Sequence, residues 1–258
     1  MNALSAFIVG FLAGTPVHDK RNQRVCRGYQ RFPLTHYRER YSQMNAPQLS
    51  GMTTRQEVII RGEGPPTLEL APGISIREFA SGRIGAIGLS TSIARLAPGA
   101  HLPYHVHPCG ESVAVLKGKL ESAIEGRTYH LLPFDCIHIP AGVPHSAKNI
   151  ENECELILHN TFSSAEVSRT PVNTVFAHQD RSHLLAEPDA PESLRRLSLG
   201  EEYELSKNVL LRDLFAHRFG STGISGQLGL FSPGARLPWQ TSQFDGSVSA
   251  SWLDGSMT

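Results

Sequence analysis

The segment from residue 84 to residue 158 consists of short apolar runs separated by turn residues, and this pattern limits the chain to a β fold. Val, Ile and Leu dominate the runs, and Pro-Gly, Lys-Gly, Glu-Gly and Ala-Gly pairs separate them. The runs are 84–96, 112–116, 120–124, 128–132, 136–139 and 154–158. Glu125-Gly126, between two of them, predicts a tight hairpin. Strands at this spacing, with almost no helical pattern, predict an all-β sandwich or barrel.

The chain also repeats itself at a constant offset of 135 residues. Residues 69–113 align with residues 204–248 without a gap, and 14 of the 45 aligned pairs are identical. Many of the other pairs are apolar in both copies, such as Ile93 and Leu228. Self-similarity of this kind indicates that the two segments share one fold. The second segment stops soon after the aligned block, so we expect an incomplete repeat over residues 204–258.

Four side chains of the first segment combine into a candidate metal centre. His105 and His107 are two residues apart, so in a strand both imidazoles point to the same face. Glu111 follows a short Pro-Cys-Gly turn and begins the next strand, and His145 begins another strand after a Pro-and-Gly turn. Three imidazoles and one carboxylate suit a divalent metal of the first transition row. An open coordination position would permit Lewis-acid or oxygen chemistry, with Glu111 as the candidate catalytic residue.

Both motifs around these residues resemble the signature motifs of the cupins. The first motif, G-x5-H-x-H-x3-E-x6-G, is matched in full by Gly99, His105, His107, Glu111 and Gly118. The second, G-x5-P-x-G-x2-H-x3-N, is matched by Pro140, Gly142, His145 and Asn149. Phe134 stands where the first Gly of the second motif is usual, a departure that affects a turn and not a ligand. The resemblance covers residues 69–162 strongly and 204–255 weakly.

The resemblance implies a cupin jelly-roll β-barrel with one divalent metal ion inside, held by His105, His107, Glu111 and His145. Fe²⁺ is the favoured ion, with Mn²⁺, Ni²⁺ or Zn²⁺ as alternatives. In the second segment Gln240, Ser242 and Gly246 stand at the positions of the first three ligands. The arrangement therefore resembles a two-barrel cupin whose second barrel is degenerate and cut short.

Three further residues near the motifs are weaker candidates. His138 and His159 lie on predicted strands, where each can either face the cavity or support the fold. Strand faces alternate and the sequence does not fix the strand register, so we favour the supporting role for both. Cys109 lies between the ligands, yet nothing pairs with it by spacing, so we expect a spectator. The four cysteines contain no CxxC pair, which argues against a thiolate zinc site.

The remaining segments flank the barrel, which we place at residues 52–165. Residues 1–51 carry seven basic and two acidic side chains, and we expect a flexible basic tail there. Residues 166–203 form a connector with a short helix over 191–199, where a Pro near the start and Gly200 at the end resemble helix boundaries.

Composition excludes several classes of protein. The formal net charge is zero, with 24 basic and 24 acidic residues, so no nucleic-acid partner is expected. No apolar stretch reaches the roughly 18 residues that span a bilayer. The apolar stretch near the N-terminus lacks the preceding positive residues of a secretory signal, so we expect a cytoplasmic protein.

The leading functional hypothesis is a small-molecule dioxygenase-like oxidoreductase with a centre of three His and one Glu. The resemblance leaves two alternatives open, because cupin folds support many chemistries. One is a non-catalytic sensor or binding module, similar to the zinc anti-sigma factors. The other is a sugar isomerase with a non-redox metal. The partner in each case is a small-molecule substrate or ligand. The sequence leaves open whether the chain forms a homodimer.

Overall fold

The computed structural model describes residues 6–11, 67–172, 190–221, 223–236 and 249–254, with 6–11 and 249–254 described by their backbone alone. Nearly all the regular structure in these residues is strand. The helical elements described are three short 3-10 helices: η1 (Gly82–Ile84), η3 (Leu197–Leu199) and η4 (His217–Phe219). Among the described residues there is no helix with the length and hydropathy that crossing a membrane requires. The all-β prediction is confirmed.

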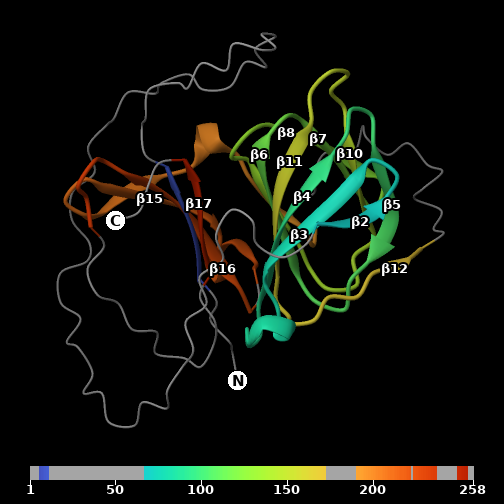
Figure 1. Cartoon of the computed structure of the whole chain (residues 1–258), viewed down its shortest axis with the longest axis horizontal. Helices are drawn as coiled ribbons and strands as arrows, with labels where there is room; N and C mark the ends of the chain where they lie inside the picture. The colour runs from blue at the N-terminus through green and yellow to red at the C-terminus, as the bar shows by residue number, and fades with distance from the viewer. Residues whose placement is uncertain (1–5, 12–66, 173–189, 222, 237–248, 255–258) are drawn as a thin grey trace.

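Two sheets form the barrel and enclose its interior (Figure 1). The seven-stranded barrel sheet has the order β13 (Ser193–Arg195), β9 (Cys136–Ile139), β6 (Glu111–Lys117), β11 (Leu156–Phe162), β4 (Ser90–Leu96), β3 (Ile74–Ala80) and β2 (Leu68–Ala71). The five-stranded barrel sheet has the order β12 (Thr170–Pro171), β5 (His101–Val106), β10 (His145–Asn149), β7 (Leu120–Ile124) and β8 (Arg127–Leu131). Neighbouring strands in both sheets run antiparallel.

The barrel core lies between these two sheets because alternate residues of each strand point inward. Val113 and Val115 of β6 and Ile137 and Ile139 of β9 share one buried cluster with Leu120 of β7 on the other sheet. The jelly-roll barrel implied by the resemblance is confirmed. One end of this interior carries the polar residues described below.

The turns explain where strands begin and end. Glu125 and Gly126 have φ angles of 46° and 84°, and Ile124 pairs with Arg127, which is the hairpin predicted there. The expected strand 84–96 is shorter in the structure, because Gly85 and Gly88 adopt φ angles of 86° and 71° and interrupt the extended chain. The strand β4 therefore begins at Ser90.

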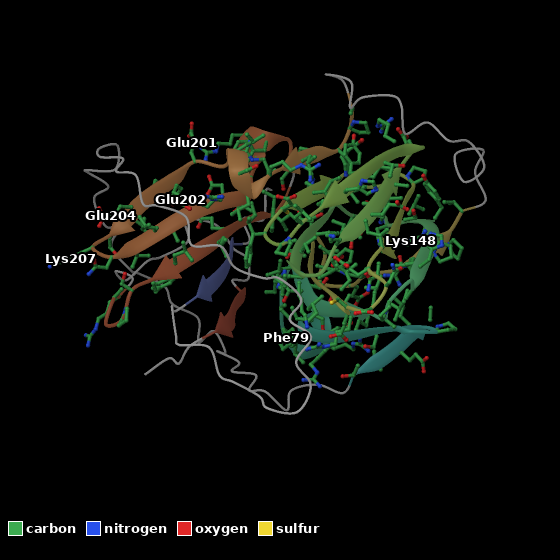
Figure 2. All side chains as sticks on the ribbon, turned by 90° about the horizontal axis from the view of Figure 1, so that it is seen from above. Phe79, Lys148, Glu201, Glu202, Glu204 and Lys207 are labelled. Atoms are coloured by element: carbon green, nitrogen blue, oxygen red, sulfur yellow. The ribbon has the colours of Figure 1, made fainter. Side chains whose placement is uncertain are left out.

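A third sheet, which we call the docked sheet, lies beside the barrel in Figure 1. Its order is β14 (Glu202–Ser206), β15 (Val209–Phe215), β16 (Ser225–Phe231), β1 (Ala6–Phe11) and β17 (Ser249–Asp254). One buried cluster joins it to the outer face of the seven-stranded barrel sheet. The members are Leu89, Ala114 and Cys136 of the barrel with Leu214, Phe215, Ile224 and Leu228 of the docked sheet. Figure 2 shows charged side chains, including Glu204 and Lys207, on the part of the docked sheet remote from the barrel.

The elements of the docked sheet recur at the sequence offset of 135 residues. Shifting β3 (Ile74–Ala80) by 135 gives β15 (Val209–Phe215), and shifting β4 (Ser90–Leu96) gives β16 (Ser225–Phe231). The helices η1 and η4 correspond in the same way. The assignment of residues 204–258 as an incomplete second cupin repeat stays a prediction, and its residues 237–248, with Gln240, Ser242 and Gly246, lie outside the described part of the chain.

Strand β1 (Ala6–Phe11) differs from the expected flexible tail over residues 1–51. It lies between β16 and β17 and runs parallel to both. In the barrel, β11 occupies the corresponding place between β4 and β6, where it runs antiparallel. The physical reason is that Ala-Phe-Ile-Val-Gly-Phe favours a strand, which pairs with the edge of β16 and joins β17 to the sheet. Residues 12–51 lie outside the described part.

The connector also differs from the sequence expectation. Ser193–Arg195 form β13 instead of the start of a helix, and only Leu197–Leu199 form a 3-10 turn. The reason is tertiary: β13 pairs with β9, which would otherwise be the edge strand of its sheet, and so satisfies backbone groups of β9 that a local helix would leave unpaired. Glu192 strengthens the attachment, because its carboxylate accepts two hydrogen bonds from Arg127 at 2.7 and 2.8 Å.

Asn149, the last residue of the second motif, is expected to support the barrel from a fully buried position. Its Nδ2 donates to the carbonyls of Leu96, Ala97 and Cys154 at 2.8–3.1 Å, and its Oδ1 accepts from the Glu151 amide. Asn149→Asp replaces these donors by an acceptor. We expect a loss of about 3 kcal/mol or more, and a fall of roughly 6–12 °C in the thermal midpoint.

Circular dichroism melting of the full chain measures this effect. Lys148→Gln, at the exposed neighbouring position, is the matched control and should melt like the wild type. Equal midpoints for Asn149→Asp and the wild type would show that these hydrogen bonds contribute nothing.

Candidate metal centre

The four predicted ligands come from both sheets of the barrel. His105 lies in β5, Glu111 begins β6 and His145 begins β10, while His107 follows the end of β5. His145 pairs with His105 across the ladder between β10 and β5. Glu111 belongs to the opposite sheet, so the short turn between β5 and β6 brings the carboxylate to the imidazoles. The grouping predicted from the spacing is therefore present in the structure.

The candidate ligand atoms converge on one small volume. One ligand atom from each of the four side chains lies within 4.8 Å of the others, and all four residues are buried. Glu111 Oε2 lies 3.0 Å from His145 Nε2 and 3.4 Å from His107 Nε2. The imidazole rings of His105 and His145 have centroids 4.3 Å apart.

Backbone carbonyls orient all three imidazoles. The Nδ1 atoms of His105, His107 and His145 lie 2.8, 2.7 and 2.9 Å from the carbonyl oxygens of Pro103, Ser168 and Val143. Since a carbonyl oxygen only accepts, these contacts require a proton on each Nδ1. A neutral imidazole then carries its lone pair on Nε2, the atom that faces the shared volume.

This donor set fits a divalent cation. His107 Nε2 is buried and has no hydrogen-bond partner, and the Nε2 lone pair of His145 faces the Glu111 carboxylate, which also only accepts. Buried acceptors that face one another repel unless a cation or a proton lies between them. Nitrogen and oxygen donors without a thiolate suit Fe²⁺, Mn²⁺, Ni²⁺ or Zn²⁺.

The protonation states of Glu111 and His105 suit a ligand set, whereas the pKa of His107 is raised, because the interaction with Glu111 outweighs burial. Burial alone would raise the pKa of Glu111, but His107 and His145 hold the pKa of that carboxyl well below its usual range. Burial, followed by the neighbouring His145, lowers the pKa of His105 to about 3. Glu111 is therefore a carboxylate and His105 a neutral imidazole at pH 7.

His138 and His159 lie on the other face of the seven-stranded barrel sheet. His138 pairs in register with Ser112, whose neighbours Glu111 and Val113 line the interior, so its ring points outward toward the boundary with the docked sheet. The Nδ1 of His138 lies 2.8 Å from Ser112 Oγ. His159 pairs with Ala114, which belongs to the cluster at that boundary. Neither ring belongs to the converging group, which agrees with the favoured structural role.

Cys109 is buried between the ligands, but its sulfur does not belong to the converging group. Burial, with the Glu111 carboxylate, raises the pKa of the Cys109 thiol to about 11. The protonated thiol is a poor ligand and nucleophile at pH 7, in accordance with the expected spectator role.

Phe134, the departure from the second motif, has a positive φ of 69°. Glycine adopts this conformation freely, whereas a residue with a side chain is strained there by about 1–2 kcal/mol. The Phe134 ring packs against the cluster that joins the docked sheet to the barrel, and that contact offsets the strain. The position at which the chain departs from the second motif is thus also a position at which the docked sheet is attached to the barrel.

Sequence reasoning missed two contributors to the site, both in the connector. The Ser168 carbonyl orients His107, and Arg169 lines the cavity that His105, Glu111 and His145 also line. The backbone role of Ser168 leaves no signal in a residue pattern. Arg169 belongs to neither motif, and its position beside the cavity follows only from the folded chain, in which its segment returns along β5.

The buried, neutral His138 predicts that acid destabilises the fold in a defined pH window. Burial lowers the pKa of His138 to about 4, against about 6.5 in the unfolded chain. Between these values the unfolded state binds a proton that the folded state does not, so stability falls as the pH falls from about 6.5 to about 4. His138→Gln removes this titration, and between pH 7 and pH 4.5 the variant should lose about 2–3 kcal/mol less than the wild type.

Urea unfolding of metal-free protein at the two pH values measures this difference. His130→Gln, at an exposed position, is the control and should follow the wild type. The same loss in His138→Gln and wild type would contradict a buried, neutral imidazole.

Comparison with known proteins identifies the class of domain. Residues 92–162 match the family model described as the cupin domain, and this segment carries all four converging residues. The barrel is therefore a cupin domain.

The relatives differ in how much of each chain is shared. Quercetin 2,3-dioxygenase of Bacillus subtilis is 41% identical over 56 residues, which is 21% of this chain and 17% of that enzyme. Among solved structures, KdgF from a Halomonas species has a TM-score of 0.37 and 21% identity, covering 42% of this chain and 94% of that one. An RmlC-like cupin from Shewanella frigidimarina has a TM-score of 0.37 and 22% identity, covering 43% and 94%.

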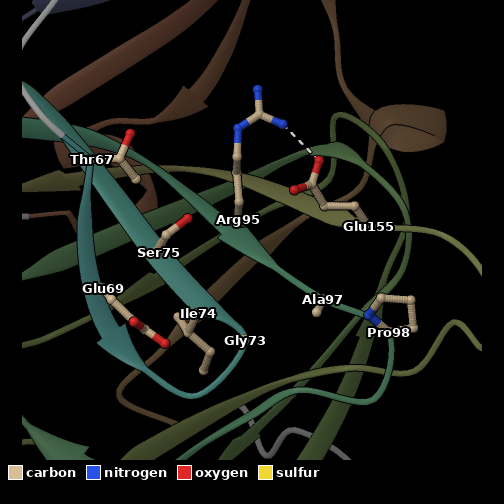
Figure 3. Close-up of a pocket in the computed structure, with 9 residues that line it drawn as sticks. All are labelled: Thr67, Glu69, Gly73, Ile74, Ser75, Arg95, Ala97, Pro98 and Glu155. Atoms are coloured by element: carbon tan, nitrogen blue, oxygen red, sulfur yellow. Dashed lines mark hydrogen bonds and ion pairs between the residues drawn. The ribbon is translucent and has the colours of Figure 1, made fainter.

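A second pocket lies on the surface, at the turn that joins β2 to β3 (Figure 3). Its lining includes Gly73, Ser75, Arg95 and Glu155, and Arg95 forms an exposed ion pair with Glu155 at 2.6 Å. None of the four converging residues lines it. We assign no function to this pocket.

Proposed function

We propose that the cupin domain is a metal-dependent, dioxygenase-like oxidoreductase that uses one Fe²⁺ ion held by His105, His107, Glu111 and His145. The observation that carries this proposal is the convergence of three imidazoles and one carboxylate in a buried volume with no thiolate. The identity shared with a quercetin dioxygenase over 56 residues supports this reaction class. Bound iron would supply oxygen activation and a place for a substrate oxygen.

The residues of the chain would contribute position and proton transfer. The carbonyls of Pro103, Ser168 and Val143 hold the three rings in place, which keeps their Nε2 atoms aimed at one point. Glu111 is ionised and can accept the proton of a substrate hydroxyl. Apolar side chains, among them Leu102, Val113 and Leu158, line the cavity and exclude water from the reacting groups.

Oxygen consumption tests the proposal. Protein loaded with Fe²⁺ under anaerobic conditions is mixed with oxygenated buffer and a panel of enols and phenolics. We expect uptake with at least one compound, and both atoms of labelled O₂ in the product, because a dioxygenase needs no other reductant. Glu111→Gln should abolish uptake.

The control is His101→Ala, an exposed position on β5, which should retain activity. Iron-loaded protein that consumes no oxygen with any member of the panel would contradict the dioxygenase proposal and favour the sensor or isomerase alternatives.

A further inference from the structure

Asn160 carries a buried amide that faces the cavity of the candidate metal centre. It lies in β11, where it alternates with the outward-facing His159 and Thr161, and it lines the cavity together with Glu111. Asn160 is only 8% exposed, and its Oδ1 atom has no hydrogen-bond partner among the described residues. A buried acceptor without a donor is costly, so this oxygen requires a donor that the described residues do not supply.

The surroundings of Asn160 differ from those of an amide that supports the fold. Ser92 and Val113 lie opposite it on the two adjacent strands, and neither forms a hydrogen bond with its Oδ1. Arg169 also lines the cavity, but its Nε atom has no partner either, so the two side chains do not satisfy each other. Asn149, the other buried asparagine of the described residues, makes four hydrogen bonds with backbone groups. The contrast indicates that Asn160 serves a ligand and not the barrel.

Asn160 lies one inward-facing position away from the converging ligands. Phe162, the next residue of β11 on the same face, pairs with Glu111, and its ring centroid lies 5.0 Å from that of His107. Residues two apart in a strand are separated by about 6.5–7 Å. A small molecule that binds a metal ion at the four ligands through one atom can therefore reach Asn160 with the atoms next to it.

Size and charge indicate which donor fits beside Asn160. The free volume of the cavity is about 30 Å³, which accommodates a group about as large as a water molecule. An amide donor is larger than this. An ammonium group is disfavoured, because a divalent ion and Arg169 would already place positive charge in the cavity. A neutral hydroxyl group meets both requirements, since its single O–H can donate to an amide oxygen.

We propose that Asn160 Oδ1 accepts a hydrogen bond from a hydroxyl group of the substrate, and that the substrate therefore carries a hydroxyl close to the atom that binds the metal. This inference rests on the proposed metal function. It makes Asn160 a residue that determines specificity, and it gives a reason for a buried amide whose oxygen the surrounding side chains leave without a donor.

Binding of two matched probes to cobalt-loaded protein tests the inference without any turnover. The visible absorption of Co²⁺ is recorded under anaerobic conditions while hydroxylamine or O-methylhydroxylamine is added. Both probes can bind a metal through nitrogen, but only hydroxylamine carries an O–H donor, so wild type should bind it more tightly. Asn160→Leu keeps the size of the side chain, and Asn160→Ala leaves more room. Each should lower the preference for hydroxylamine by about tenfold, while Co²⁺ affinity stays unchanged. Agreement between the two variants separates the hydrogen bond from a steric effect.

Lys148→Gln, at an exposed position on the same strand as His145, is the control and should keep the wild-type preference. An unchanged preference in Asn160→Leu or Asn160→Ala, with Co²⁺ retained, would overturn the role of Asn160 and leave the metal assignment standing. Wild type that binds hydroxylamine no better than O-methylhydroxylamine would overturn the hydroxyl requirement, and this comparison needs no variant. Failure of wild type to bind Co²⁺ would overturn the metal function and this inference together.

Discussion

His145→Ala protein will bind divalent metal at least about 100-fold more weakly than the wild type. The substitution removes one of four converging donors, and even the loss of a group that only orients a ligand costs a metal site about 10- to 100-fold. At a metal concentration 100 times the wild-type dissociation constant, the bound ion stabilises the fold by about 2.7 kcal/mol, and most of this is lost in the variant. Calorimetric titration with Fe²⁺ or Co²⁺ under anaerobic conditions measures the affinity.

Two further variants make this experiment specific. Glu111→Gln keeps the shape of the side chain but removes the charge, and it should weaken binding like His145→Ala. His101→Ala, an exposed imidazole on the same strand as His105, should bind metal like the wild type. Unchanged affinity in His145→Ala would show that His145 is not a ligand.

Phe215→Ala will detach the docked sheet from the barrel. Phe215 is 2% exposed and belongs to the cluster that joins the two, and truncation of a buried Phe costs about 3–5 kcal/mol. Gly226→Ala should act on the same contact, because a Cβ there would overlap with Phe215 Cζ and displace the ring. We expect backbone amides of residues 209–231 to exchange at least about 100-fold faster in either variant, while those of the barrel core stay protected.

The control is Leu230→Ala on β16, where the side chain is 37% exposed and lies outside the cluster. It should leave exchange nearly unchanged. Exchange of residues 209–231 in Phe215→Ala at the wild-type rate would show that the cluster does not hold the docked sheet in place.

The sequence predicted the barrel because its signals are local. Alternating apolar residues and turn glycines act within a few positions, so the hairpin at Glu125-Gly126 and the strand Leu120–Ile124 are where the pattern places them. The ligand grouping was predictable for the same reason. His105 and His107 point to the same face because they are two residues apart, and one short turn brings Glu111 close to them. His145 lies opposite His105 in the neighbouring strand.

The features that were missed depend on contacts distant in sequence. Strand β13 lies where a helix was expected, because β9 offers it a ladder that no local pattern encodes. Strand β1 pairs with residues more than 200 positions away. Arg169 reaches the cavity because β12 returns along β5. In each case tertiary pairing decides the outcome.

Anomalous diffraction from crystals of the full chain grown with Fe²⁺ or Co²⁺ tests the central claim most directly. The account predicts one strong peak per chain inside the barrel, about 2.0–2.2 Å from the Nε2 atoms of His105, His107 and His145 and from a carboxylate oxygen of Glu111. A metal bound at other residues, or a barrel without any peak in protein grown with the metal in excess, would contradict it.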